Sequence, residues 1–415
     1  SNSVTPVSTY WFAYVGLKGN GGAIDTSGNP IIFTQQGWAK LDTSGSVTQQ
    51  GAVTGPNSVG SVWTAGYSPS LNRYYFLGTD SSSRPQVTIV NSDKSLYASK
   101  PAQVGGTNIS WMVVSQTSGT AGISLLGGNY NSGGAGTYAP ANIYMDSTAS
   151  WQNSKYVGTL TGNNGNSRYW GMKGSAYTDF ALCVFWQQNI GWSAVQNNYG
   201  GTISAGITLP NYYADFYGGA AMQQDSSGNV YIAYNISAST RVFAKFNSSF
   251  STTPIWQRQI TAGLNSAEFM DVAIDSSGNA YFIGTQSGAY SGYVVKYNSS
   301  GTLQWVRGFT GAGQGINYTA LTQGYAYSTD LYLFGGYNGS VSAVYRYPQD
   351  GSITGTYSAG GSDTVVISSV SVTESAASQT FTAGTITTTN ITGSGATGNS
   401  VTITTPTNTY TKVST

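Results

Sequence analysis

The chain has 415 residues, 7% of them charged and 13% aromatic, and a formal net charge of +1. Ordinary globular proteins carry about 25% charged residues, so we expect a surface of hydroxyls and amides. The aromatic content argues against disorder. The absence of a basic stripe argues against nucleic-acid binding, and the apolar runs are too short for insertion into a membrane.

Short apolar runs bounded by Gly, Asn, Asp and Ser recur along the chain, and this pattern predicts β-strands joined by tight turns. The clearest unit is 267–309, with turns at Asp275–Asn279 and Asn298–Gly301 and with Trp305 in its last strand. The second strands of successive units are predicted to end near residues 34, 78, 127, 184, 234, 284 and 335. Such a period indicates a repeat architecture.

Four antiparallel strands in a unit of about 50 residues are typical of a propeller blade. We therefore predict an all-β, seven-bladed β-propeller over residues 1–361, with the repeats themselves in about 16–361. Residues 9–16 (TYWFAYVG) look like a displaced fourth strand. We expect this strand to complete the last blade beside Val344–Tyr347; the alternative is a simple extra edge strand.

Residues 362–415 differ in kind, because they are rich in Thr and Ser, alternate with period two and show no repeat. They predict a C-terminal β-rich arm or a small β appendage. A long β-arm can add a strand to a neighbouring subunit, so other structural subunits are the expected partners of 362–415 in an oligomer. A tail that packs on its own chain is the alternative.

A family resemblance follows from the repeat. Asp-Ser-Ser-Gly-Asn, a Tyr two residues later, a Val-x-Lys-Tyr/Phe strand, a second turn and a Trp resemble the bacterial β-propeller repeat of secreted and surface proteins, most clearly over 221–310. The resemblance implies a propeller scaffold with many uses. The arm is similar to segments of phage tail-associated proteins. Together these likenesses imply an extracellular or virion location.

The chain contains no histidine, which removes imidazole bases and most nucleophilic triads and zinc sites. Most aspartates stand in turns, where Asp bonds the backbone two residues on. These are Asp25, Asp42, Asp93, Asp225, Asp275 and Asp350. We predict no catalytic residue, cofactor or metal site. Calcium binding at these turns, through oxygen ligands, is an open alternative. The lone Cys183 is expected to be a buried thiol.

Aromatic residues open the first strand of nearly every unit, and in a propeller this position lies near the central channel. A ring of them can stack on sugar faces; packing between blades is the alternative. The predicted ligand-binding residues are Trp63, Trp111, Trp170, Tyr217, Phe269 and Tyr318. Glu268 is predicted to face the channel entrance, with Asp271 on the opposite face of its strand.

These expectations favour a non-catalytic structural or adhesion module of a virion appendage or cell surface that binds host glycans at the channel face. One alternative is a secreted carbohydrate-active or calcium-binding propeller. Another is an assembly subunit that docks other structural proteins.

Overall fold

The computed structural model describes most of the chain. The described residues exclude 1–9, 16–18, 55–63, 80–84, 102–111, 117–121, 132–137, 158–166, 175–179, 188–190, 199–202, 214–219, 265, 287–290, 313–319, 337–340, 361–362, 385–387, 391–401, 407, 409 and 415. Most strand residues between 112 and 204 are described by their backbone. Every regular element in the described part is a β-strand, which confirms the all-β prediction. No helix that could span a membrane occurs there.

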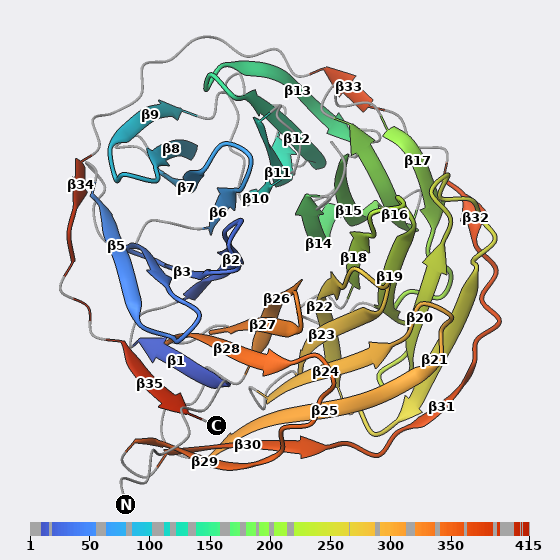
Figure 1. Cartoon of the computed structure of the whole chain (residues 1–415). Coiled ribbons are helices and arrows are strands. Elements are labelled where there is room, and N and C mark those ends of the chain that lie inside the picture. The colour runs from blue at the N-terminus through green and yellow to red at the C-terminus, as the bar shows by residue number, and fades with distance from the viewer. Residues whose placement is uncertain are drawn as a thin grey trace, which may run out of the picture.

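The strands form seven antiparallel sheets that Figure 1 shows arranged as a ring, each with one strand near the centre and the others further out. This is the architecture of a β-propeller. The first sheet contains β2 (Gly19–Ile24), β3 (Pro30–Thr34), β4 (Gly37–Leu41) and β5 (Val47–Thr54). The second contains β6 (Thr64–Ser68), β7 (Arg73–Thr79), β8 (Pro85–Asn91) and β9 (Leu96–Pro101). The third contains β10 (Met112–Gln116), β11 (Gly122–Asn131), β12 (Tyr138–Asp146) and β13 (Trp151–Val157).

The remaining sheets repeat this order. The fourth contains β14 (Ser167–Gly174), β15 (Phe180–Gln187), β16 (Gly191–Asn198) and β17 (Ile203–Thr208). The fifth contains β18 (Ala220–Gln224), β19 (Val230–Asn235), β20 (Arg241–Phe246) and β21 (Trp256–Ala262). The sixth contains β22 (Ala267–Ile274), β23 (Ala280–Gln286), β24 (Ser291–Tyr297) and β25 (Leu303–Ala312). The seventh contains β26 (Leu321–Tyr327), β27 (Asp330–Gly335) and β28 (Ser342–Pro348), and its fourth strand is β1 (Trp11–Val15).

The hydrophobic core lies between neighbouring sheets. Both faces of a middle strand are covered by the adjacent sheets, so β19 and β20 are buried along their whole length. The second strands therefore read as continuous apolar runs rather than as alternating ones. Between the fifth and sixth sheets, the rings of Phe243 and Phe282 meet at 4.9 Å and those of Phe243 and Tyr297 at 5.3 Å. Aromatic residues thus fill the wedge between the sheets.

The N-terminal strand closes the ring. β1 pairs antiparallel with β28, and the register places Trp11 opposite Arg346 and Val15 opposite Ser342. The chain break of the ring therefore lies inside the seventh sheet, between β28 and β1. Residues 9–16 were expected beside Val344–Tyr347, and Ala13 is the residue opposite Val344.

The C-terminal arm runs around the outside of the ring, opposite to the chain order of the sheets (Figure 1). It adds an edge strand to each sheet in turn, except that the described residues contain no such strand on the second sheet. In chain order, its strands are β29 (Gly355–Gly360) and β30 (Asp363–Ser369) on the sixth sheet, β31 (Thr373–Ala376) on the fifth, β32 (Thr382–Ala383) on the fourth, β33 (Thr388–Asn390) on the third, β34 (Thr402–Thr404) on the first and β35 (Thr411–Ser414) on the seventh.

These arm strands belong to the propeller sheets and do not form a separate β unit. Each is paired along at least one edge within its own chain, as in the self-packed alternative of the sequence analysis. Strand addition to a neighbouring subunit stays a prediction. We call residues 363–414 the belt. The belt is anchored by apolar side chains, since Val365 and Ile367 are buried and Phe381 packs on Phe246 with ring centroids 5.0 Å apart.

Candidate functional site

The aromatic residues predicted to line the channel lie mostly outside the described residues. These are Trp63, Trp111, Tyr217 and Tyr318, whereas Trp170 lies in β14 with only its backbone described. Phe269 is fully buried, and its ring packs edge-on against Phe243 of the preceding sheet at 5.0 Å. It therefore fills the seam between two sheets. This corrects its assignment to a ligand-binding ring, because a buried ring offers no face to a sugar.

Glu268 also lies away from an open entrance. Its exposed fraction is 1%. Burial, together with the nearby Glu268 charge, raises the pKa of Tyr212 above its ordinary value. Glu268 thus belongs to the buried region near Tyr212, and the expectation that it faces the channel entrance is corrected. A register shift between Phe269 and Asp271 also breaks the period-two alternation on which the predicted opposite faces of Glu268 and Asp271 rest.

The inner strands are tied to each other by a repeated side-chain contact. Asp271 Oδ2 in the sixth sheet accepts the backbone N–H of Gly324 in the seventh at 2.9 Å. Gln323 Oε1 in the seventh accepts the N–H of Gly22 in the first at 2.7 Å. Both acceptors immediately follow a register shift in their strand. Their polar groups thus serve as inter-sheet links beside the central axis.

The turn aspartates behave as predicted, because in all six the Oδ1 atom accepts the N–H two residues on at 2.9 Å. The residues are Asp25, Asp42, Asp93, Asp225, Asp275 and Asp350. The same Oδ1 takes a second N–H in several turns, as from Asn229 at 2.9 Å. The described residues contain no group of three or more His, Cys, Asp or Glu side chains that could hold a metal ion.

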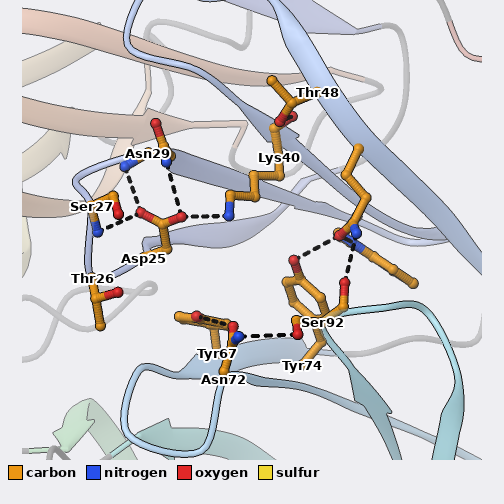
Figure 2. A network of polar contacts seen from close by, with 12 residues as sticks. Asp25, Thr26, Ser27, Asn29, Lys40, Thr48, Tyr67, Asn72, Tyr74 and Ser92 are labelled. Carbon is orange, nitrogen blue, oxygen red and sulfur yellow. Dashed lines mark hydrogen bonds and ion pairs between the residues drawn. The ribbon is translucent and has the colours of Figure 1, made fainter.

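The first and second sheets share the polar network of Figure 2. Asp25 accepts from Ser27 and Asn29 and forms an ion pair with Lys40 at 2.5 Å. Burial acts to raise the pKa of the Asp25 carboxyl, but hydrogen bonds from Lys40 and Asn29 hold this pKa below its ordinary value. The carboxylate is therefore ionised, and it fixes the turn to β4.

On the other side of the seam, within the second sheet, Tyr67 donates its hydroxyl to Asn72 Oδ1 at 2.6 Å, and Asn72 Nδ2 donates to Ser92 Oγ at 3.0 Å (Figure 2). Burial, and secondarily the Asp25 charge, raise the pKa of Tyr67 to about 12. Gln49 of the first sheet links to the second by donating Nε2 to Ser92 O at 2.6 Å. The hydroxyls are therefore neutral donors in a structural network.

A lysine in the third strand, like Lys40 of the first sheet, recurs in the fifth and sixth sheets. In the fifth sheet, Lys245 Nζ lies 3.8 Å from Asp225 Oδ2 and 4.9 Å from the centroid of the Tyr231 ring. Tyr231 in turn donates to Gly278 O of the sixth sheet at 2.9 Å. In the sixth sheet, Lys296 Nζ instead donates across the seam to Gln349 O at 2.9 Å. These cations connect turns and sheets.

Tryptophans in the fourth strands of three sheets link their sheet to a turn of the next one. In these three seams the indole Nε1 donates to the carbonyl of the second residue of the turn that follows the third strand of the next sheet. The donor–acceptor pairs are Trp256 to Ser299 at 3.2 Å, Trp305 to Gln349 at 3.3 Å and Trp11 to Thr43 at 2.9 Å. We call each such contact a Trp latch.

The Trp latch also requires a glycine in the acceptor turn. Gly301 has φ +80°, and a Cβ placed on it would lie 2.7 Å from Cδ2 of Trp256. Gly351 and Gly45 hold the same relation to Trp305 and Trp11. An arginine reinforces two latches, since Arg258 and Arg307 donate Nε to the carbonyls of Gly301 and Gly351, both at 2.9 Å. The repeated Trp of one sheet and the turn Gly of the next sheet are thus the two partners of a single contact.

Sequence reasoning found the Trp and the turn Gly as repeat markers but missed that they touch. The sequence distance from a fourth-strand Trp to the turn it contacts is close to the length of one repeat unit, as from Trp256 to Ser299 and from Trp305 to Gln349. This regular distance could have paired each Trp with the turn of the next unit. Gln49, Asp271 and Gln323 had no such signal, because their partners are backbone groups of another sheet. The described polar groups at these seams are consequently engaged in holding the ring.

Comparisons with known proteins give structural likenesses alone. No protein-family model matches the chain, and no curated protein matches it. The WD40 domain of Toxoplasma gondii coronin is similar with TM-score 0.49 and 13% identity, over 82% of this chain and 87% of that one. The Neurospora crassa Pan2 WD40 domain is similar with TM-score 0.47 and 12% identity, over 80% and 89%.

A chain of a mitotic checkpoint complex structure is similar with TM-score 0.49 and 11% identity, over 79% of this chain and 86% of that one. All three TM-scores lie below 0.5, so these likenesses carry no functional argument. The fold assignment follows from the sheets and their ring.

Proposed function

We propose that the chain is a non-catalytic structural and adhesive module of a virion appendage or cell surface, built as a seven-bladed propeller whose belt binds its blades together. The observation that carries the proposal is the belt, because its strands extend the sheets of six blades. A strand that pairs with an outer edge removes that edge from solvent and from unwanted pairing. Such reinforcement suits a module that must stay folded outside a cell.

The use of the polar groups supports the same proposal. The charged side chains of the seams bind turns and backbone carbonyls of the adjacent blade, as Arg307 does with Gly351 at 2.9 Å. Turn carboxylates are tied to their own backbone, as in Asp275 with Ser277 at 2.9 Å. With 7% charged residues in the whole chain, the exposed surface is left mainly to hydroxyls, amides and aromatic rings, which are the groups that contact sugars.

The ligand of the adhesive function is proposed to be a host glycan at the channel face, bound by the aromatic residues that open the first strands. Binding of the full chain to a glycan array tests this directly. Trp170→Ala should abolish the signal. Tyr327→Ala is the matched control, because this tyrosine is 37% exposed and is the last residue of β26, where its hydroxyl donates to Thr26 O in a turn of the first sheet; its loss should leave binding unchanged.

Two results would contradict the proposal. If the full chain binds no glycan on the array, the adhesive role is refuted. Release of sugar from a bound glycan, measured by mass spectrometry of the array eluate, removes the non-catalytic one and favours a carbohydrate-active propeller.

A further inference from the structure

The two ends of the described chain meet in one sheet. β1 lies between β28 and β35, so the strand that closes the ring is paired on both of its edges. The β35 register places Phe12 opposite Val413 and Tyr14 opposite Thr411. Figure 1 shows β35 beside β1 at the end of the belt. The last strand among the described residues is thus paired with the first.

The beginning of the belt reaches the same place. β29, which precedes the belt in the chain, lies against β35. Tyr14 of β1 donates its hydroxyl to the backbone carbonyl of Ala359 in β29. The described belt therefore starts and ends next to the closing strand, after pairing with the sixth, fifth, fourth, third and first sheets in turn. We call this junction of β29, β1 and β35 the buckle.

Side chains hold the buckle together as well. The Phe12 ring stacks on Tyr345 of β28 at 5.2 Å, and Val413 of β35 packs against the same hydrophobic cluster. Tyr410, just before β35, packs against a second cluster that contains Trp11. Burial acts to raise the pKa of the Asp42 carboxyl in the first sheet, whereas hydrogen bonds from Ser44 and Ser46 and, after them, the charge of the exposed Lys412 lower it. β35 thus bridges the seventh and first sheets.

Every other sheet is formed by strands that follow one another in the chain, apart from β29 and the belt strands, so a connection that is short in sequence returns a frayed strand to its place. β1 has no such connection to β28, because 326 residues separate their nearest ends, Val15 and Ser342. A strand that is paired along one edge and joined to its partner by no short connection opens readily. Pairing of its second edge by β35 opposes that fraying.

We infer that β35 controls opening of the ring: the buckle is a reversible clasp, and release of the C-terminal strand frees β1 and opens the seventh sheet while the other six keep their pairing. The inference rests on the geometry of the buckle and is independent of any glycan ligand.

The test uses the full chain with proline substitutions and measures backbone hydrogen exchange by mass spectrometry. Proline removes an N–H and resists pairing in a sheet. Val413→Pro, at the centre of β35, should release that strand. Ile403→Pro is the matched control, because Ile403 is the central residue of β34, is also partly buried and pairs with Val53 of the first sheet.

Val413→Pro should speed exchange in β1 and β28 by at least about tenfold, since exchange follows local opening. Ile403→Pro should speed exchange in β5 and leave β1 at the wild-type rate. Tyr14→Phe, which keeps the ring but removes the bond to Ala359, gives a milder version that preserves the fold; it should speed β1 exchange by a smaller factor. Unchanged β1 exchange when residues 411–414 have become exposed would overturn the inference, as would equal effects of the two proline variants on β1.

Discussion

The contact between a fourth-strand tryptophan and the turn glycine of the next blade can be isolated with two glycines that have the same backbone conformation. Gly301 has φ +80° and Gly228 has φ +81°, and both stand in turns. A Cβ on Gly301 would lie 2.7 Å from Trp256, whereas one on Gly228 would have its nearest neighbour, Ser248 Cβ, at 3.2 Å. The backbone cost of alanine is therefore shared, and the clash with Trp256 is not.

The magnitudes follow from these two terms. Alanine at a left-handed position costs about 1–2 kcal/mol, so Gly228→Ala should lower the free energy of unfolding by about that much. Gly301→Ala adds overpacking against an indole that is 8% exposed, which costs a further 1–3 kcal/mol or so. We expect about 2–5 kcal/mol in total for Gly301→Ala.

Urea unfolding followed by tryptophan fluorescence and far-ultraviolet circular dichroism measures the difference. The control is the same pair of substitutions in a Trp256→Ala background, where the excess cost of Gly301→Ala should vanish and the two glycine variants should become equal. Equal costs in the wild-type background, or an excess that persists without Trp256, would refute the proposed role of the Trp latch.

Three further predictions test other contacts. Phe381→Ala should release the belt at the fourth sheet, because Phe381 is 4% exposed and packs on Phe246. The free energy of unfolding should fall by less than the 3–5 kcal/mol or so of a core Phe→Ala change, since the belt can detach locally. Amide hydrogen exchange at β31 and β32 checks this, with Thr382→Ala as the control. Asp271→Ala should destabilise by about 1–3 kcal/mol, because it removes the acceptor of the Gly324 N–H, whereas Asp271→Asn keeps an acceptor; equal losses in urea unfolding would contradict this. The pKa of Asp25 is lowered in the folded chain, so its contribution is present above its unfolded pKa and is lost as pH falls through the folded value. The stability gap between wild type and Asp25→Asn should thus shrink below about pH 4, and a gap that stays constant down to pH 2 would refute it.

Much of the architecture could be predicted from the sequence, because strands and turns depend on residues close together in the chain. The strand-and-turn pattern is local, since an Asp such as Asp275 bonds its own backbone and the next strand must be apolar on both faces. The displaced strand at the N-terminus was also visible, because Trp11 stands where the other units carry a Trp.

The belt was not legible in the same way. Its strands are two to seven residues long, and their partners are backbone groups of sheets far away in the chain. The Thr/Ser alternation of 362–415 shows that a segment can pair, but it holds nothing that selects the edge. Phe381, Tyr410 and a few aliphatic residues mark where the described part of the belt touches the core.

For the candidate site, the sequence identified residue types that suit binding but did not predict which of these residues are buried. Phe269 and Glu268 carry the residue types of a binding surface, yet both are buried at a seam, because the first residues of an inner strand face the adjacent sheet as well as the channel. A bulge at Met270 adds to this by breaking the alternation from which facing was predicted. Period-two reasoning fails where the register shifts.

The central claim is that the belt binds the blades of its own chain. Ser375 lies opposite Gln259 in the β21–β31 register, and Gln259 Nε2 donates to Ser375 Oγ at 3.2 Å, so their side chains share one face of the sheet. Cysteines at these two positions, with Cys183 replaced by alanine, report which chain supplies the edge strand. The account predicts a disulfide within one chain, seen as a monomer in a non-reducing gel and by intact mass. Disulfide-linked dimers would contradict it and would place the belt on a neighbouring copy.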